Sequence, residues 1–420
     1  MKYPLIFAIA LLFRPLFFIT TYFLGFQISE ESMGFTIASI VLDLAIVVMF
    51  IKYISRSKIG KHTFFGLFFV VLMLVLAILS YLRLQLHAFT LNYFIKYFLS
   101  LSIPFFALGI MIDLSNKSFS FLFEEYLTIL SIFIIFSFLY ITLTSITEVQ
   151  QLTGVNTLNY QSIGYYLTFS GLIVFLFSFD RQKPFLFVKL LAYILSFFLV
   201  IFTGARGPLI AFFLGTVAIA FFKSRRVFIS ILIIAIVFIL LLNPIIDVLY
   251  NYFPSFSHGV IRGLSFLYFG RNQEYPLSGQ IATREHLYRK ALDLLGDYPV
   301  FGTGIGGFSY HSGIMSYPHN IVLEILAEYG VFGLTMFFIL FSYLYSKVRK
   351  HIKKSIGLLL VIFVFSITQL LFSGSFLCST ELWFCAGALF SYLDKAKVVK
   401  SKGRTLLMEN VNFFPIRKQN

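Results

Sequence analysis

The sequence predicts an all-α membrane protein with many transmembrane helices, and three observations support this prediction. Hydrophobic residues make up 59% of the 420-residue chain and charged residues only 12%, about half the charged fraction of an ordinary soluble domain. The apolar residues gather in runs of about 20, the length at which a helix crosses a bilayer. Basic residues concentrate in alternate loops between these runs, as the positive-inside rule expects of a multi-pass protein.

About twelve apolar segments follow one another along the chain. They lie at residues 4–24, 33–51, 63–81, 92–112, 121–143, 161–179, 185–202, 208–222, 227–249, 320–346, 355–373 and 377–393. Basic residues cluster between them at 52–61, 223–226 and 347–354, whereas the intervening short loops hold little that is basic beyond Arg83 and Arg206. We therefore expect both termini to be cytoplasmic.

This topology divides the chain into four parts. Residues 1–249 hold spans 1–9, residues 250–319 form a large external loop with short amphipathic helices, residues 320–393 hold spans 10–12, and residues 394–420 form a basic cytoplasmic tail. The net charge of +15 is placed largely where it sets topology. We therefore expect membrane lipids, and no nucleic acid, as partners.

Charge, histidine and glycine concentrate between residues 283 and 333. The pattern predicts an amphipathic helix over 284–295, ended by Gly296 and Pro299. A glycine-rich turn follows at 302–307. Its G-x-G-x-x-G spacing also fits dinucleotide-binding loops, but those follow a strand and open a helix, whereas a helix precedes this turn. A flexible turn and a close approach to a phosphate or sugar remain open.

The external position of this region limits its chemistry. Neither ATP nor nucleotide sugars are normally available on that side of the membrane. A substrate must therefore arrive already activated, and a lipid carrier can deliver it in that form.

Several motifs follow one another from residue 203 onward. They are Thr203-Gly204-Ala205-Arg206-Gly207, Arg284-x-x-x-Tyr288, Tyr298-Pro299-x-x-Gly302-x-Gly304 and His319-Asn320-x-x-Leu323-Glu324-x-x-Ala327-Glu328-x-Gly330-x-x-Gly333. This succession resembles the signature region of the O-antigen ligase and O-antigen polymerase superfamily. The resemblance covers most of the chain from about residue 155.

The resemblance implies a mainly helical, GT-C-like membrane glycosyltransferase of inverting type in a bacterial inner membrane. Its members take glycan from an undecaprenyl-pyrophosphate carrier at the outer face. One branch transfers the glycan to lipid A-core, and another transfers it to a second lipid-linked repeat unit. We favour the polymerase of a surface polysaccharide (O-antigen, capsule or exopolysaccharide), since polymerases occur in both envelope types; other polysaccharide assembly proteins would then be partners.

Three alternatives stay open. An O-antigen ligase would share the motifs. A transporter or flippase of lipid-linked oligosaccharide would share the topology, but it should place polar residues at mid-membrane depth and show related halves. A non-catalytic scaffold would not need the arginine and histidine residues.

Arginine is the expected partner of the leaving pyrophosphate. The chain holds no Asp-x-Asp motif and no external carboxylate pair beyond Glu30-Glu31, so we expect neither a metal nor another cofactor. The guanidinium fork suits phosphate oxygens because it donates two parallel hydrogen bonds. Arg206 and Arg284 are the candidates. The alternatives are a headgroup-facing arginine and a solvated helix face, respectively.

His319 is the candidate acid–base residue, at the expected N-terminus of span ten. It can take the proton of an attacking hydroxyl, a role that contributes about 10²–10⁴-fold. Binding a phosphate or capping the helix are the alternatives. We expect Arg206, Arg284 and His319 to converge at the outer membrane face.

We predict that seven further residues bind substrate. Tyr288 lies one turn beyond Arg284, and Glu324 is an acid inside a span, where charges are costly and usually paired. The full set is Tyr288, Gly302, Gly304, Asn320, Glu324, Arg262 and Arg271.

Overall fold

The computed structural model of the chain describes residues 4–26, 32–57, 59–83, 94–144, 160–179, 185–241, 244, 278–313, 317–348 and 357–411. Within these ranges every regular element is a helix. The all-α prediction is therefore confirmed.

Six helices are long and apolar enough to cross a membrane. They are α3 (Met33–Ile54), α4 (Lys61–Arg83), α7 (Lys117–Thr144), α9 (Tyr160–Ser178), α11 (Arg206–Lys223) and α17 (Ile321–Val348). In α17 the membrane-spanning part ends at Leu344. A bent pair, α1 (Pro4–Leu11) and α2 (Phe13–Phe23), makes a seventh if it forms one span. The chain is thus a multi-pass membrane protein, as predicted.

Other helices occupy the remaining predicted segments. They are η1 (Phe94–Ser102, a π-helix), α6 (Ile103–Met111), α10 (Leu186–Phe202), α12 (Arg225–Leu240), α18 (Gly357–Phe372) and the long α19 (Thr380–Val411). Each of the twelve predicted segments therefore contains a helix.

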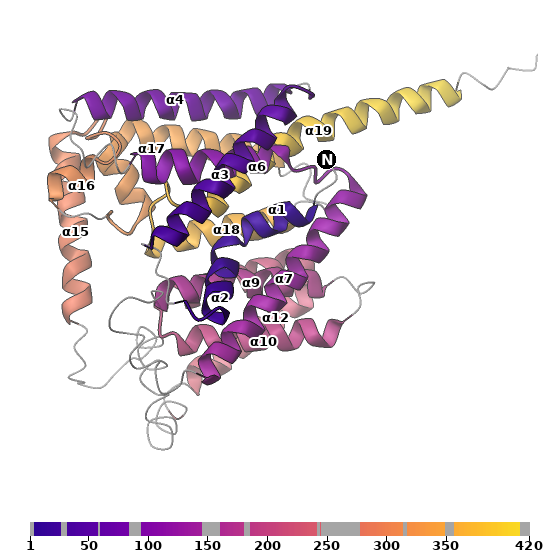
Figure 1. Ribbon diagram of the computed structural model, residues 1–420, viewed down its shortest axis with the longest axis horizontal. Coiled ribbons are helices and arrows are strands. Elements are labelled where there is room, and N and C mark those ends of the chain that lie inside the picture. The colour runs from indigo at the N-terminus through magenta and orange to yellow at the C-terminus, as the bar shows by residue number, and fades with distance from the viewer. Residues whose placement is uncertain are drawn as a thin grey trace, which may run out of the picture.

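Two helices of the predicted external loop lie at one end of the bundle. Figure 1 shows α15 (Ser278–Asp297) crossing that end beside α16 (Gly307–Ser312), while α19 extends beyond the opposite end. The prediction ended the first of these helices at Gly296, but Tyr298 N–H still donates to the Leu294 carbonyl at 2.9 Å. Pro299, which lacks an N–H, follows directly and stops the helix.

At the opposite end, residues near the start of the basic tail form hydrogen bonds to α4 and to the residues after α6. Asp394 accepts hydrogen bonds from the backbone N–H groups of His62 (3.0 Å) and Thr63 (2.7 Å), at the start of α4. A carboxylate is favourable there because the first N–H groups of a helix are free. Lys395 donates to the Ile112 carbonyl at 3.1 Å and lies 3.7 Å from Asp113. The start of α4, the end of α6 and the middle of α19 thus meet on one side.

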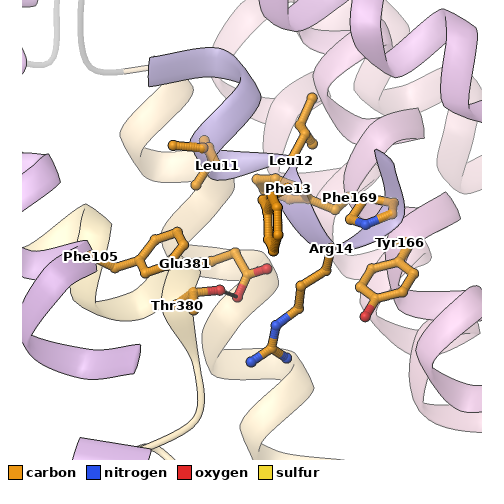
Figure 2. Close-up of a pocket in the computed structure, with 11 residues that line it drawn as sticks. Leu11, Leu12, Phe13, Arg14, Phe105, Tyr166, Phe169, Thr380 and Glu381 are labelled. Carbon is orange, nitrogen blue, oxygen red and sulfur yellow. Dashed lines mark hydrogen bonds between the residues drawn. The ribbon is translucent and has the colours of Figure 1, made fainter. Parts of the chain in front are cut away.

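A small pocket lies at the bend between α1 and α2, whose axes differ by 78°. Figure 2 shows Arg14 entering it from α2 and Glu381 from α19, with Thr380 donating to Glu381 at 3.1 Å. Arg14 also acts electrostatically on Asp43, a buried residue of α3.

Candidate functional site

The amphipathic helix α15 packs against the start of α17. Leu287, Ala291 and Leu294 recur at helical spacing and are buried with Phe308 of α16 and Ala327 of α17. Arg284 precedes Leu287 by three positions, so it lies on the same face of α15. Packing of this apolar stripe therefore directs Arg284 toward the beginning of α17.

Asn320 caps α17. Its side-chain oxygen accepts hydrogen bonds from the N–H groups of Val322 (3.0 Å) and Leu323 (3.2 Å), and its amide nitrogen donates to the Leu371 carbonyl at 3.5 Å. Asparagine is among the best residues for this role. Asn320 therefore has a structural role as a helix cap, and its substrate-binding role stays a prediction.

His319 stands outside the helix. Its φ of 58° lies in the left-handed region, which is uncommon for a residue with a side chain and is often found at functional sites. The ring meets Tyr317 edge-on, with centroids 4.5 Å apart. Its Nδ1 is buried without a hydrogen-bond partner among the described residues.

The electrostatics of His319 favour a neutral ring. Burial, followed by the positive charge of Arg284, lowers its pKa to about 4, because both effects penalise the imidazolium. At neutral pH the ring therefore holds a free nitrogen lone pair.

Tyr165 of α9 links Arg284 to the Arg206 turn. Arg206 begins α11, and a Cβ placed on the next residue, Gly207, would lie 2.3 Å from the Tyr165 hydroxyl. Arg284 and Tyr317 act electrostatically on the same hydroxyl. Thr168 strengthens this junction by donating to the Pro208 carbonyl at 3.1 Å.

Four elements therefore meet around Tyr165: α9, the start of α11, α15, and the segment before α17. Arg284 and His319 lie within electrostatic range of each other, and Arg206 adjoins the residue that Tyr165 contacts. Residues from three of the sequence motifs, the Arg206 turn, Arg284 and His319, are thus linked through Tyr165 and Arg284.

Residues 191–338 match the family model described as O-antigen ligase, a match over about a third of the chain. This segment is therefore similar to an O-antigen ligase domain. Members of this family are glycosyl-transferring enzymes of membranes. No curated protein matches the sequence. The matched segment includes Arg206, Arg284 and His319, so the resemblance read from their motifs is confirmed.

Within the family domain, the glycine turn completes a broken membrane helix. Gly330 has a φ of 63° and a ψ of −164°, which interrupts α17. Residues 299–304 lie against this break and form four backbone hydrogen bonds with it: Thr303 N to Ala327 O (2.9 Å), Gly304 N to Glu328 O (2.7 Å), Val331 N to Pro299 O (2.9 Å) and Phe332 N to Val300 O (3.1 Å).

The close approach predicted for Gly302 and Gly304 is therefore to protein. A Cβ on Gly302, whose φ is 65°, would lie 2.4 Å from the backbone of Glu328, and one on Gly304 would lie 2.3 Å from the Ser80 hydroxyl. The Gly302 carbonyl accepts from Arg83 at 3.2 Å. These contacts give both glycines a structural role, and the substrate-binding role stays a prediction.

The two acids of α17 hold two loops, one inside the matched segment and one beyond it. Glu324 is fully buried and accepts hydrogen bonds from the Ser375 hydroxyl and from the Phe376 N–H (3.3 Å). Glu328 accepts from the Gly306 N–H at 2.9 Å. Burial and these bonds make Glu324 an anchor of the loop before α19, and its substrate-binding role stays a prediction.

The other candidate residues are placed as follows. Tyr288 is partly buried on α15, one turn beyond Arg284. Arg262 and Arg271 lie outside the described residues. His311 packs between Tyr298 and Tyr310, with ring centroids 5.7 and 5.1 Å away.

Two aromatic residues of the site were not predicted. Tyr165 lies in an apolar span beside another tyrosine, and Tyr317 lies in the loop before α17. Neither belongs to a recognisable motif. In the part of the chain that the structure describes, no three His, Cys, Asp or Glu side chains gather to hold a metal ion.

Proposed function

We propose that the protein polymerises repeat units of a surface polysaccharide, taking glycan from an undecaprenyl-pyrophosphate carrier at the outer face of the bacterial inner membrane. The observation that supports this function is the meeting of Arg284 with a neutral His319, next to the Arg206–Gly207 start of α11. Arg284 provides positive charge for a pyrophosphate, and His319 provides a base for a hydroxyl.

The proposed reaction is a single displacement. His319 takes the proton of a hydroxyl on the acceptor sugar, and that oxygen attacks the anomeric carbon of the donor. The bond between this carbon and the phosphate oxygen breaks, and the lipid pyrophosphate leaves with the electron pair. Attack opposite the leaving group inverts the anomeric configuration.

Arg206 and Arg284 stabilise the charge that develops on the pyrophosphate. The first N–H groups of α11 add to this stabilisation, because they have no partner within their own helix and the helix dipole favours an anion there. Tyr288 is placed on the acceptor side, one turn along α15.

An O-antigen ligase that transfers glycan to lipid A-core is the second candidate, favoured by the description of the matched family. The two activities differ in the acceptor. The test uses purified protein in lipid nanodiscs with lipid-linked repeat units as the only substrate. A polymerase forms a ladder of longer lipid-linked chains, a ligase acts only after lipid A-core is added, and a transporter forms no new glycosidic bond.

The same assay tests the proposed independence from metal. The rate should survive excess chelator, because arginine side chains carry the charge of the leaving group. A rate that disappears with chelator and returns with a divalent cation would contradict this part of the proposal.

A further inference from the structure

We infer that Tyr165 is a substrate-binding residue of this site, and that its hydroxyl donates a hydrogen bond to a phosphate oxygen of the leaving pyrophosphate. The inference rests on the proposed function. It adds a ligand that lies within a membrane span and belongs to no motif of the family domain.

The Tyr165 hydroxyl is buried, and among the described residues no group is within hydrogen-bond geometry of it. The side chain is 4% exposed. Ser373 approaches the hydroxyl, but no described group meets hydrogen-bond geometry with it. A buried hydroxyl without a partner is costly, so the site is complete only when another polar group enters.

The surroundings of the hydroxyl select an anion. It lies against Gly207 in the first turn of α11, at the positive end of the helix dipole. Arg284 is within electrostatic range of it. A phosphate oxygen can accept from the tyrosine while its charge faces the arginine and the helix N-terminus.

A second unsatisfied atom supports the same conclusion. His319 Nδ1 is also buried without a partner among the described residues, and Arg284 acts on both groups. The tyrosine needs an acceptor and the neutral histidine needs a donor. A pyrophosphate and a sugar hydroxyl, bound together, supply one of each.

Tyr193 provides a matched control. It is another tyrosine of an apolar helix, partly buried, but its hydroxyl is paired with Thr216 at 3.0 Å. Tyr193→Phe removes a satisfied hydrogen bond, whereas Tyr165→Phe removes an unsatisfied hydroxyl. In the empty protein, Tyr193→Phe should lower Tm, and Tyr165→Phe should leave it unchanged or raise it.

The test measures transfer rate and Tm for both variants, each with and without undecaprenyl pyrophosphate. We expect Tyr165→Phe to slow transfer by about 10- to 100-fold, the range for a hydrogen bond to a charged group. It should also reduce the rise in Tm that undecaprenyl pyrophosphate causes. Tyr193→Phe should keep both the rate and the ligand-induced rise.

A double-mutant cycle tests the contact with Gly207. Gly207→Ala places a methyl group against the Tyr165 hydroxyl and should slow transfer, whereas in Tyr165→Phe the clashing oxygen is gone. The double variant should therefore be no slower than Tyr165→Phe alone. If the losses of the two single variants multiply in the double variant, the contact between Gly207 and Tyr165 is contradicted.

The same measurements distinguish an error in the proposed function from an error in the assignment of Tyr165. If the wild-type protein neither transfers glycan nor gains Tm with undecaprenyl pyrophosphate, the proposed function is wrong. If the wild-type protein does both and Tyr165→Phe matches it, the assignment of Tyr165 is wrong.

Discussion

The positive charge of Arg284 lies within electrostatic range of the His319 ring, although the two residues are 35 positions apart in the chain. Together with burial, this charge keeps the imidazole neutral. The pair therefore combines an anion-binding group with a base, and the first two predictions separate these roles.

The first prediction concerns pH. Because the pKa of His319 is lowered to about 4, the transfer rate should stay level from neutral pH to about 5 and fall through about pH 4. The free energy of unfolding has a related dependence. The unfolded chain takes up the proton first, near the ordinary histidine pKa of 6.5, so the His319 contribution is complete above that value and declines toward pH 4.

His319→Gln is the control for this prediction. It should abolish most transfer and remove the His319 component from the pH dependence of Tm. A wild-type rate that already falls near pH 6.5 would show that the ring titrates normally in the working enzyme.

The second prediction concerns the arginines. Arg206→Ala and Arg284→Ala should each lower the transfer rate by about 100-fold or more while expression and Tm are maintained, because a developing charge loses its partner. Lysine should restore only part of the rate, since it keeps the charge but loses the fork. Arg289→Ala is the matched control: Arg289 is exposed and, among the described residues, is bonded to Glu285 at 2.6 Å, so its loss should change the rate little.

The third prediction separates capping from substrate binding at Asn320. Asn320→Ala should cost about 1 kcal/mol of stability, and Asn320→Ser should recover most of it because serine also caps helices well. If Asn320→Ser is stable but loses transfer, the residue does contact substrate and the capping assignment is incomplete.

The fourth prediction compares two glycines close in sequence. A Cβ on Gly302 meets the α17 backbone at 2.4 Å in a left-handed conformation, whereas one on Gly296 meets nothing within 4 Å. Gly302→Ala should therefore lower Tm sharply, and Gly296→Ala, inside α15, should stabilise by about 0.5 kcal/mol. Equal Tm values for the two variants would show that the turn is not pressed against α17.

The fifth prediction concerns sidedness. In a variant lacking Cys378 and Cys385, a single cysteine at the exposed Asp297 should react with an impermeant thiol reagent in intact cells. A cysteine at the exposed Arg56 should react only after the membrane is opened. The reverse pattern would place the site on the cytoplasmic side.

Local sequence patterns were sufficient to predict the helices and to select candidate site residues. Apolar runs of membrane length located the spans, and the motifs of the external loop identified Arg284 and His319. The cap at Asn320 was also readable, since an asparagine directly before an apolar run is an N-cap signal. It was missed because the neighbouring histidine suggested a binding motif.

The remaining features depend on contacts that no local pattern contains. Glu324 was expected at a functional position because acids are costly inside a span, but its partner Ser375 lies 51 positions away. Glu328 likewise bonds Gly306, 22 positions earlier. Tyr165 acquires significance only because α9 packs beside the start of α11. These relationships are tertiary, and they decide which polar residues face the site and which support it.

The interruption of α17 also determines how the protein can be recombined. Lipid offers no hydrogen bonds, so a broken membrane helix persists only where other protein groups satisfy its backbone. Here residues 299–304 supply all four of those bonds, and neither segment is complete alone. A chimera that exchanges external loops between relatives must therefore transplant residues 299–304 together with residues 327–332 as one unit, or leave bare peptide groups in the bilayer.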